Sequence, residues 1–249
     1  MPALEGKTAL VFGASRGIGA AVARLFVAEG ALVVLASRDL AALEALAAEL
    51  QPAAVAVQTD MAVPDQVRRA VTATLERFGR LDIAVNNAGV SPRRTDFAEL
   101  SEEAFDAAID VNLRGVFIAM KAEIAAMRAT GGGSIVNTGS IASLVGLPQM
   151  AAYVASKHAL AGLTKSAALD CAKHGIRVNM VAPGTVMTDM LRAGAAATPE
   201  GKARLEAATP MGRIASPDEA ASAILWLASP AASYVTGTIL PVDGGYTVG

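Results

Sequence analysis

Three side chains in the second half of the chain have types and spacing suited to proton transfer. Tyr153 and Lys157 stand four residues apart, so a helix would place them on one face. A free phenol has a pKa of about 10 and a free amine about 10.4, and a neighbouring ammonium stabilises the phenolate. Ser140 precedes them and ends the predicted strand and turn Val136–Ser140, where its hydroxyl is placed to bond a substrate carbonyl. A Tyr-x-x-x-Lys pair alone also occurs on ordinary helix surfaces.

A glycine-rich turn follows the first predicted strand and leads directly into a predicted helix. Glycines let the backbone approach a pyrophosphate, while a helix N-terminus supplies free N–H groups and a positive dipole. The spacing is G-x-x-x-G-x-G and not the commoner G-x-G-x-x-G, and glycine clusters also mark plain turns. The turn predicts phosphate contacts from Gly13, Ser15, Arg16, Gly17, Ile18 and Gly19.

The end of the second predicted strand points to the type of dinucleotide. Folds that bind NAD usually carry an acid there for the ribose hydroxyls, whereas this strand ends with Ser37 and Arg38. A guanidinium pairs well with a 2′-phosphate, and Arg16 adds a second cation. Asp39 is better placed to cap the next helix. The sequence therefore favours NADP(H) over NAD(H); the alternative is that both arginines are solvated surface charges.

Strands and helices alternate along the whole chain, which predicts parallel strands joined by right-handed crossovers. We expect an α/β fold with a Rossmann-like doubly wound parallel sheet of about seven strands, helices on both faces and a single domain over residues 1–249. The irregular segment Thr185–Ser216 is long enough to be a substrate lid. The expected strands are Thr8–Phe12, Leu32–Ala36, Ala53–Gln58, Leu81–Val85, Ser134–Thr138, Arg177–Ala182 and Ile239–Val242. The expected helices are Ile18–Glu29, Asp39–Leu50, Asp65–Phe78, Glu102–Arg128, Ala151–Lys173 and Pro217–Leu227.

Composition excludes several classes of protein. The net charge of -2 provides no basic field for nucleic acid, and no apolar stretch approaches the roughly 20 residues of a membrane span. The first residues, Met1–Lys7, do not have the pattern of a signal peptide. A lone cysteine, Cys171, and two histidines predict neither an intrachain disulfide nor a zinc site. We expect a cytoplasmic protein without a metal.

Taken together, these residues resemble the short-chain dehydrogenase/reductase family over essentially the whole chain. The order and spacing of the set are highly specific. The family often has Thr just before the first glycine, whereas this chain has Phe12, so packing beneath the turn is expected to differ. The marks are Gly13-x-x-x-Gly17-Ile18-Gly19, Asp60, Asn86-Asn87-Ala88-Gly89, Asn112, Ser140, Tyr153-x-x-x-Lys157, Pro183-Gly184 and Val242-Asp243-Gly244-Gly245.

The resemblance implies a role for each matching residue. Tyr153 would be the general acid in reduction and the base in oxidation, while Lys157 would hold the nicotinamide ribose and lower the tyrosine's pKa. Ser140 would orient the carbonyl, and Asn112 would position a water in a proton relay. Hydride would pass between nicotinamide C4 and a carbinol carbon without a metal. Further cofactor contacts would come from Ser37, Asp60, Met61, Asn87, Ala88, Gly89, Pro183, Gly184, Val186 and Thr188.

The loops after the strands indicate the substrate. Their residues are mostly apolar, which favours a neutral ketone or secondary alcohol, although half of them would simply pack the lid. Arg93 and Arg94 would bind an anionic substrate group or be solvated. The apolar candidates are Ala142, Leu144, Val145, Leu147, Met150, Met187, Met190 and Leu191.

Three other functions are compatible with this fold. A β-ketoacyl-carrier-protein reductase needs a cationic docking patch, for which Arg128, Lys173 and Arg177 are candidates. A sugar or polyol dehydrogenase would need more polar pocket walls. A non-catalytic nucleotide-sensing scaffold should have lost one of the proton-transfer residues. The resemblance also implies a homotetramer, with the predicted helices Glu102–Arg128 and Ala151–Lys173 packing across one two-fold axis.

Overall fold

The computed structural model describes residues 2–194 and 196–248, apart from the side chain of Met190. Its centre is a parallel sheet with the strand order β3-β2-β1-β4-β5-β6-β7, which confirms the predicted Rossmann-like, doubly wound fold. The order reverses between β1 and β4, the place where open α/β sheets bind ligands. The strands are β1 (Thr8–Phe12), β2 (Leu32–Ser37), β3 (Ala54–Gln58), β4 (Ile83–Asn86), β5 (Gly133–Thr138), β6 (Ile176–Pro183) and β7 (Ile239–Val242).

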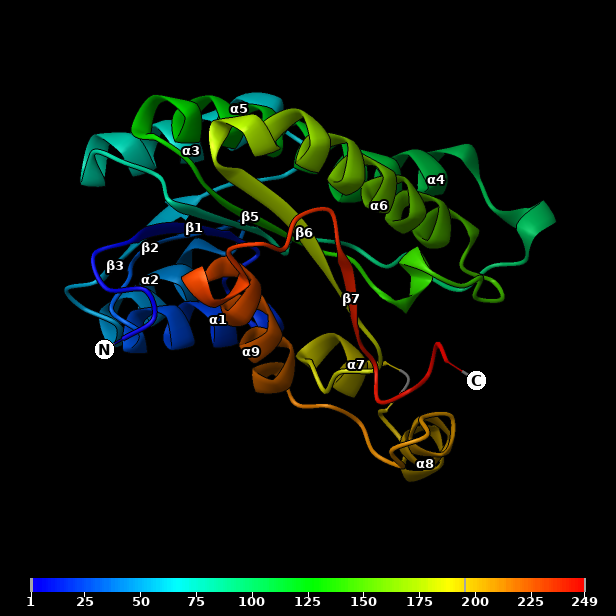
Figure 1. Ribbon diagram of the computed structural model, residues 1–249. Helices are drawn as coiled ribbons and strands as arrows, with labels where there is room; N and C mark the ends of the chain where they lie inside the picture. Colours follow the sequence, from blue (N-terminus) through cyan, green and yellow to red (C-terminus); the bar gives the residue numbers. More distant parts are fainter. Residues whose placement is uncertain (1, 195, 249) are drawn as a thin grey trace.

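Helices cover both faces of this sheet (Figure 1). The central strands are apolar on both sides, and every residue of β1 and β4 is buried, as expected for parallel strands between two helical layers. One face carries α1 (Gly17–Ala28), α2 (Leu40–Glu49) and α9 (Pro217–Ala228), and the other carries α3 (Pro64–Phe78), α5 (Gly115–Thr130) and α6 (Ala151–Cys171). The short 3-10 turns are Phe97–Glu99, Ile141–Ser143, Ala172–His174 and Pro230–Ala232.

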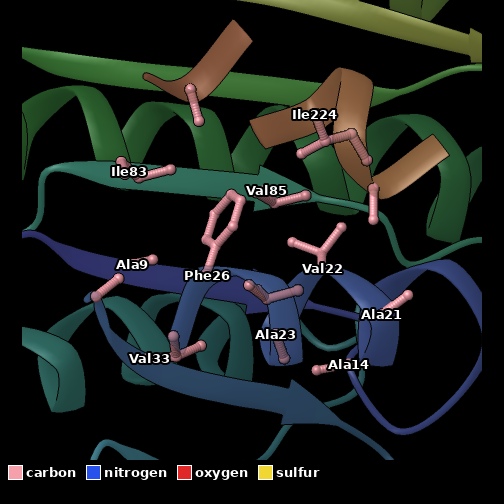
Figure 2. Close-up of a cluster of buried hydrophobic side chains, with 14 of the residues drawn as sticks. Ala9, Ala14, Ala21, Val22, Ala23, Phe26, Val33, Ile83, Val85 and Ile224 are labelled. Atoms are coloured by element: carbon pink, nitrogen blue, oxygen red, sulfur yellow. The ribbon is translucent and has the colours of Figure 1, made fainter. Parts of the chain in front are cut away.

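Each face of the sheet has its own hydrophobic core. Beneath α1, the Phe26 ring packs among small and branched side chains from β4 and α9, including Val85 and Ile224 (Figure 2). On the opposite face, Leu10, Met127 and Leu160 lie in the second core. Alanines fill much of both cores, and their small side chains let the helices approach the sheet closely.

The helical stretch expected over Glu102–Arg128 consists of three elements in the structure. α4 (Glu102–Ile109) is followed by a π-helical turn, Asp110–Arg114, and then by α5. A side chain at Gly115 would collide with the backbone carbonyl of Met61, so α5 begins against the loop that follows β3. The predicted helical stretch is continuous, with αR backbone on both sides of the turn, but the π turn was not predicted because the apolar pattern continues through it.

The segment Thr185–Ser216 is less irregular than expected. It contains α7 (Asp189–Ala193) and α8 (Pro199–Ala207), each begun by a threonine whose hydroxyl accepts a backbone N–H: Thr188 from Leu191 and Thr198 from Gly201. Both are ordinary N-cap arrangements. A bridge between Val186 and Ala215 joins the two ends of the segment.

Arg177 ties β6 to the end of α9. Its half-buried guanidinium donates hydrogen bonds to backbone carbonyls at the C-terminus of that helix, and burial lowers its pKa. Cations at this position satisfy carbonyls that have no partner within the helix. Arg177 is therefore not available for the carrier-protein docking patch suggested by the sequence. The acceptors are the carbonyls of Leu227, Val235, Ala228 and Ser229.

We predict that Arg177→Met lowers the free energy of unfolding by about 1–3 kcal/mol, because it leaves buried carbonyls without donors. Denaturant unfolding at neutral pH measures the change. The exposed Arg128→Met is the matched control and should change stability by less than about 0.5 kcal/mol. Equal effects of the two substitutions would contradict this account of Arg177.

Candidate active site

A cavity of about 1120 Å³ opens at the carboxyl ends of the strands. Its walls come from the ends of β1, β2, β4, β5 and β6, from α6 and from the Thr185–Ser216 segment. Nearly all of the site residues predicted from the sequence line it; Gly19 and Asn112 do not. The predicted residues in its walls are Gly13, Ser15, Arg16, Gly17, Ile18, Ser37, Arg38, Asp60, Met61, Asn87, Ala88, Gly89, Ser140, Tyr153, Lys157, Pro183, Gly184, Val186 and Thr188.

Lys157 carries a buried ammonium beside the tyrosine ring. It lies one helical turn after Tyr153 on α6, and its Nζ is 5.7 Å from the centre of the ring. The Nζ donates a hydrogen bond of 2.8 Å to the Thr138 carbonyl at the end of β5. Burial lowers the pKa of Lys157 to about 8, because desolvation disfavours the charged form. The carbonyl oxygen of Thr138 thus anchors the predicted pair of Tyr153 and Lys157 to the sheet.

Tyr153 and Ser140 face each other across the same cavity. Burial raises the pKa of Tyr153, and the hydroxyl of Ser140 offsets part of that rise. The direction is opposite to the lowering expected from Lys157, because loss of solvent around the phenol outweighs the protein groups that stabilise phenolate. Ser140 Oγ also accepts from the backbone N–H of Ala142 at 3.2 Å, which orients the hydroxyl. The phenol is therefore held protonated, as a proton donor requires.

Asn112 lies behind the cavity and not in its wall. Its Oδ1 accepts from the Val90 N–H at 2.8 Å, and its Nδ2 donates to the Val90 carbonyl at 2.9 Å and to Ser156 Oγ at 3.1 Å. The buried amide thus clamps the loop after β4 to α6. These contacts occupy the side chain, so any water relay at this residue depends on its backbone, which lies in the π turn.

The glycine turn is shaped by close backbone contacts. Gly13 has a φ of +75°, and a Cβ there would lie 2.8 Å from the backbone N and Cα of Ala88. A Cβ at Gly19 would collide with the Gly13 carbonyl, so Gly19 acts by letting α1 approach the turn. No side chain of the described residues caps α1, whose N-cap is Arg16. These features fit a bound pyrophosphate, whose oxygens would accept hydrogen bonds from the free N–H groups at the start of α1.

The far end of the cavity is lined by one hydroxyl and two guanidinium groups. Ser37 Oγ is buried there without a hydrogen-bond partner among the described residues. Arg16 and Arg38 line the wall, and neither makes an ion pair within the described part of the chain. Asp39 accepts from the Ala42 N–H at 3.1 Å, which confirms that it caps α2.

The substrate side of the cavity is only partly as expected. Of the apolar candidates, Leu147, Met150 and Leu191 line the wall; the side chain of Met190 lies outside the described residues. Arg94 lines it as well and donates to the Pro148 carbonyl at 3.2 Å. The predicted Ala142, Leu144, Val145, Met187 and Arg93 are not in the wall.

Sequence reasoning missed several wall residues. Thr138 adjoins Ser140 on the same strand end, and the order of strands alone could have placed it there. The others follow β3 or come from α7, from α8 and its C-terminal end, and from the C-terminal segment, whose packing over the cavity has no local sequence signal. These are Thr59, Asp189, Arg204, Leu205, Ala208 and Tyr246.

Two absences complete the description. Within residues 2–194 and 196–248, no group of three or more acidic, histidine or cysteine side chains is arranged to hold a metal ion. Among the described helices, none combines the length and apolarity needed to cross a membrane.

Comparison with known proteins places this site in a family. A family model described as enoyl-(acyl carrier protein) reductase matches residues 13–247. An A-factor type gamma-butyrolactone 1'-reductase (1S-forming) of Streptomyces virginiae is 46% identical, covering 98% of this chain and 97% of the relative. The chain belongs to the short-chain dehydrogenase/reductase family.

Solved structures of this family agree closely with the fold. The crystal structure of levodione reductase matches with a TM-score of 0.94 and 32% identity, over 98% of this chain and 99% of that one. A 3-ketoacyl-(acyl-carrier-protein) reductase from Brucella melitensis, complexed with NADH, matches with a TM-score of 0.93 and 36% identity over the same shares. The family and the cavity together indicate a nicotinamide cofactor.

We predict that Gly13→Ala weakens cofactor binding at least tenfold, because the added carbon would meet the Ala88 backbone and the positive φ disfavours a side chain. Cofactor titration followed by fluorescence measures the dissociation constant. Gly162→Ala is the matched control: nothing lies within 4 Å of a Cβ there, so cofactor affinity should not change. An unaltered dissociation constant in the Gly13 variant would argue against the close approach.

Proposed function

We propose that this protein is an NADP(H)-dependent ketone reductase or secondary-alcohol dehydrogenase in which Tyr153 is the general acid and base. The observation that carries the proposal is the convergence of Tyr153, Lys157 and Ser140 on one cavity that also receives the glycine turn. The family relationship supports an oxidoreductase acting on alcohols or ketones. The cofactor, when bound, supplies the hydride acceptor or donor.

The chain's own residues would handle the substrate oxygen and its proton. Ser140 donates a hydrogen bond to the carbonyl oxygen, which polarises the bond and fixes its direction. Tyr153 gives its phenolic proton to that oxygen during reduction and takes it back during oxidation. Its raised pKa supports the reductive direction, because the phenol is protonated at neutral pH.

Lys157 would act through its position. One of its three protons is used by the Thr138 carbonyl, and the ammonium has further donors for the hydroxyls of the nicotinamide ribose. Its charge also stabilises phenolate as the proton leaves Tyr153. Asn112 would contribute by holding the loop after β4, and by presenting its backbone carbonyl to a water.

Tyr153→Phe should reduce kcat for ketone reduction by at least a thousandfold, because it removes the only proton that the phenol can give. Cofactor affinity should stay within about threefold, since the ring and its packing are kept. Stopped-flow NADPH oxidation and cofactor titration measure the two quantities. The exposed Tyr234→Phe is a matched control and should be silent. A kcat near that of the native protein in Tyr153→Phe would remove Tyr153 from this role.

The preference for NADP(H) is supported by Arg16 and Arg38 beside the unpartnered Ser37 hydroxyl. Two guanidinium groups in one wall would bind a 2′-phosphate in bidentate fashion. An acid at position 38 would instead accept the ribose hydroxyls and repel the phosphate.

Arg38→Asp should therefore shift the ratio of kcat/KM for NADPH over NADH by about a hundredfold toward NADH. Initial rates with each cofactor at one ketone concentration measure the ratio. Arg192→Asp, an exposed change on α7, is the control. An unchanged ratio in Arg38→Asp would contradict the preference for NADP(H).

We propose a neutral, moderately apolar ketone or secondary alcohol as the substrate, with Thr185–Ser216 as a lid over the same single domain. Leu147, Met150 and Leu191 in the wall support this choice. A carrier-protein substrate is less well supported, since Arg177 is committed to α9. A sugar or polyol would find few polar partners among these residues. The homotetramer and the cytoplasmic location stay predictions.

A further inference from the structure

A carboxyl group is buried behind the active site, on the face of the sheet opposite α1. Glu123 lies on α5 and has no exposed surface, and its neighbours belong to the second core. An ionised carboxylate in such a place is costly unless it is paired with a cation. No described residue forms an ion pair with Glu123.

The hydrogen bonds of this group form a chain toward the strand ends. Asn86, the last residue of β4, donates from Nδ2 to Glu123 Oε2 at 3.1 Å and to Asn137 Oδ1 at 3.0 Å. Asn137, on β5, donates in turn to Thr164 Oγ1 on α6 at 2.9 Å. The next residue, Thr138, holds Lys157 through its carbonyl. The chain thus joins α5, β4, β5 and α6 directly behind the buried ammonium.

Two acceptor atoms in this series of hydrogen bonds have no donor. Glu123 Oε1 and Asn86 Oδ1 are buried, and neither has a hydrogen-bond partner among the described residues. They are the remaining oxygens of the two side chains that are already joined through Nδ2 and Oε2. One proton on the carboxyl group would satisfy both, because a carboxylic acid and a primary amide pair through two complementary hydrogen bonds.

We propose that Glu123 is a positioning residue that works as a neutral acid, donating to Asn86 Oδ1 while accepting from Asn86 Nδ2. The pair fixes the end of β4, which leads into the cofactor-lining Asn87–Gly89. Through Asn137 it also fixes the end of β5, which holds Lys157. This role in catalysis rests on the proposed function, whereas the neutral state of the acid does not.

The titration of this group supports the geometry. Burial raises the pKa of Glu123 from 4.5 to about 8, against a smaller lowering by Asn86. Since the folded pKa lies above the unfolded one, the stability that Glu123 contributes is complete below about pH 4.5. It is lost progressively as the pH rises to about 8 and does not fall further above that.

Other ionisable groups around α5 are separated from this carboxyl. Of the other buried charges, Lys157 is held by Thr138, and Asp82, just before β4, pairs with Arg80. Arg177 on β6 faces α9. On the π turn Asp110 pairs with Arg114. On α6, Tyr153 lines the cavity and the thiol of Cys171 is buried. The other charged or titratable residues of α3, α5 and α6 are exposed: Asp65, Arg68, Arg69, Glu76, Arg77, Lys121, Arg128, His158, Lys165 and Asp170.

Glu123→Gln tests the neutral acid without any enzyme assay. The glutamine amide can donate to Asn86 Oδ1 and accept from Asn86 Nδ2, but it does not titrate. Its melting temperature should match that of the native protein near pH 5 and exceed it by a further 3–5 °C or so per pH unit up to about pH 8. A gap independent of pH would overturn the proposal, since Glu123 would then be ionised in the folded protein as it is in the unfolded chain.

Glu123→Leu tests the positioning role. Leucine has a similar volume, but it offers neither an acceptor for Asn86 Nδ2 nor a donor for Asn86 Oδ1. The melting temperature should therefore fall by about 3–10 °C. The kcat of ketone reduction should fall about tenfold or more, with the KM for substrate changed less than threefold, while Glu123→Gln should restore it.

Met127→Ala is the matched control on the same buried face of α5. It should lower the melting temperature through lost packing and leave kcat within twofold. If Met127→Ala and Glu123→Leu lower kcat equally, Glu123 has no positioning role. If Tyr153→Phe stays active while the pH series of Glu123→Gln behaves as expected, the proposed function fails and the neutral acid stands.

Discussion

The arrangement of the site depends on one buried positive charge. Lys157 is 3% exposed and has a single protein acceptor, the Thr138 carbonyl, with no carboxylate paired to it within the described residues. An ammonium in such surroundings is stable only if its other protons also find acceptors. Gly89 passes close by, where a Cβ would be 3.6 Å from Nζ. The charge faces the cavity, and the end of β5, α6 and the loop after β4 meet around it.

The sheet accounts for how residues distant in sequence meet at this charge. Parallel strands place all their carboxyl ends at one edge, so the turns after β1, β4 and β5 share a single cavity. Asn87 donates a hydrogen bond to the Gly13 carbonyl, which joins the glycine turn to the segment that borders Lys157. The proposed cofactor site and the proposed proton-transfer site are therefore joined by a direct hydrogen bond between the turns that form them.

Local patterns in the sequence predicted the strands, most helices and the Tyr153, Lys157 and Ser140 set, because each depends on short-range spacing. The cap by Asp39 was predicted for the same reason. What could not be predicted depends on distant contacts. Glu123 is of a residue type that usually lies on a solvated helix face, although it stands four residues before Met127 on the buried face of α5. Only the assembled sheet shows that its partner is Asn86 at the end of β4. The clamp made by Asn112 and the wall formed by α8 and Tyr246 likewise require the assembled chain.

The π turn at Asp110–Arg114 also bears on how this chain can change in length. A π turn holds about one residue more than the α-helical turn it replaces, so α4 and α5 are out of register with each other. Removing one residue there would restore a regular helix and rotate α4 by about 100° relative to α5. Asn112 would then lose its contacts with Val90 and Ser156. This stretch can therefore accept scarcely any insertion or deletion.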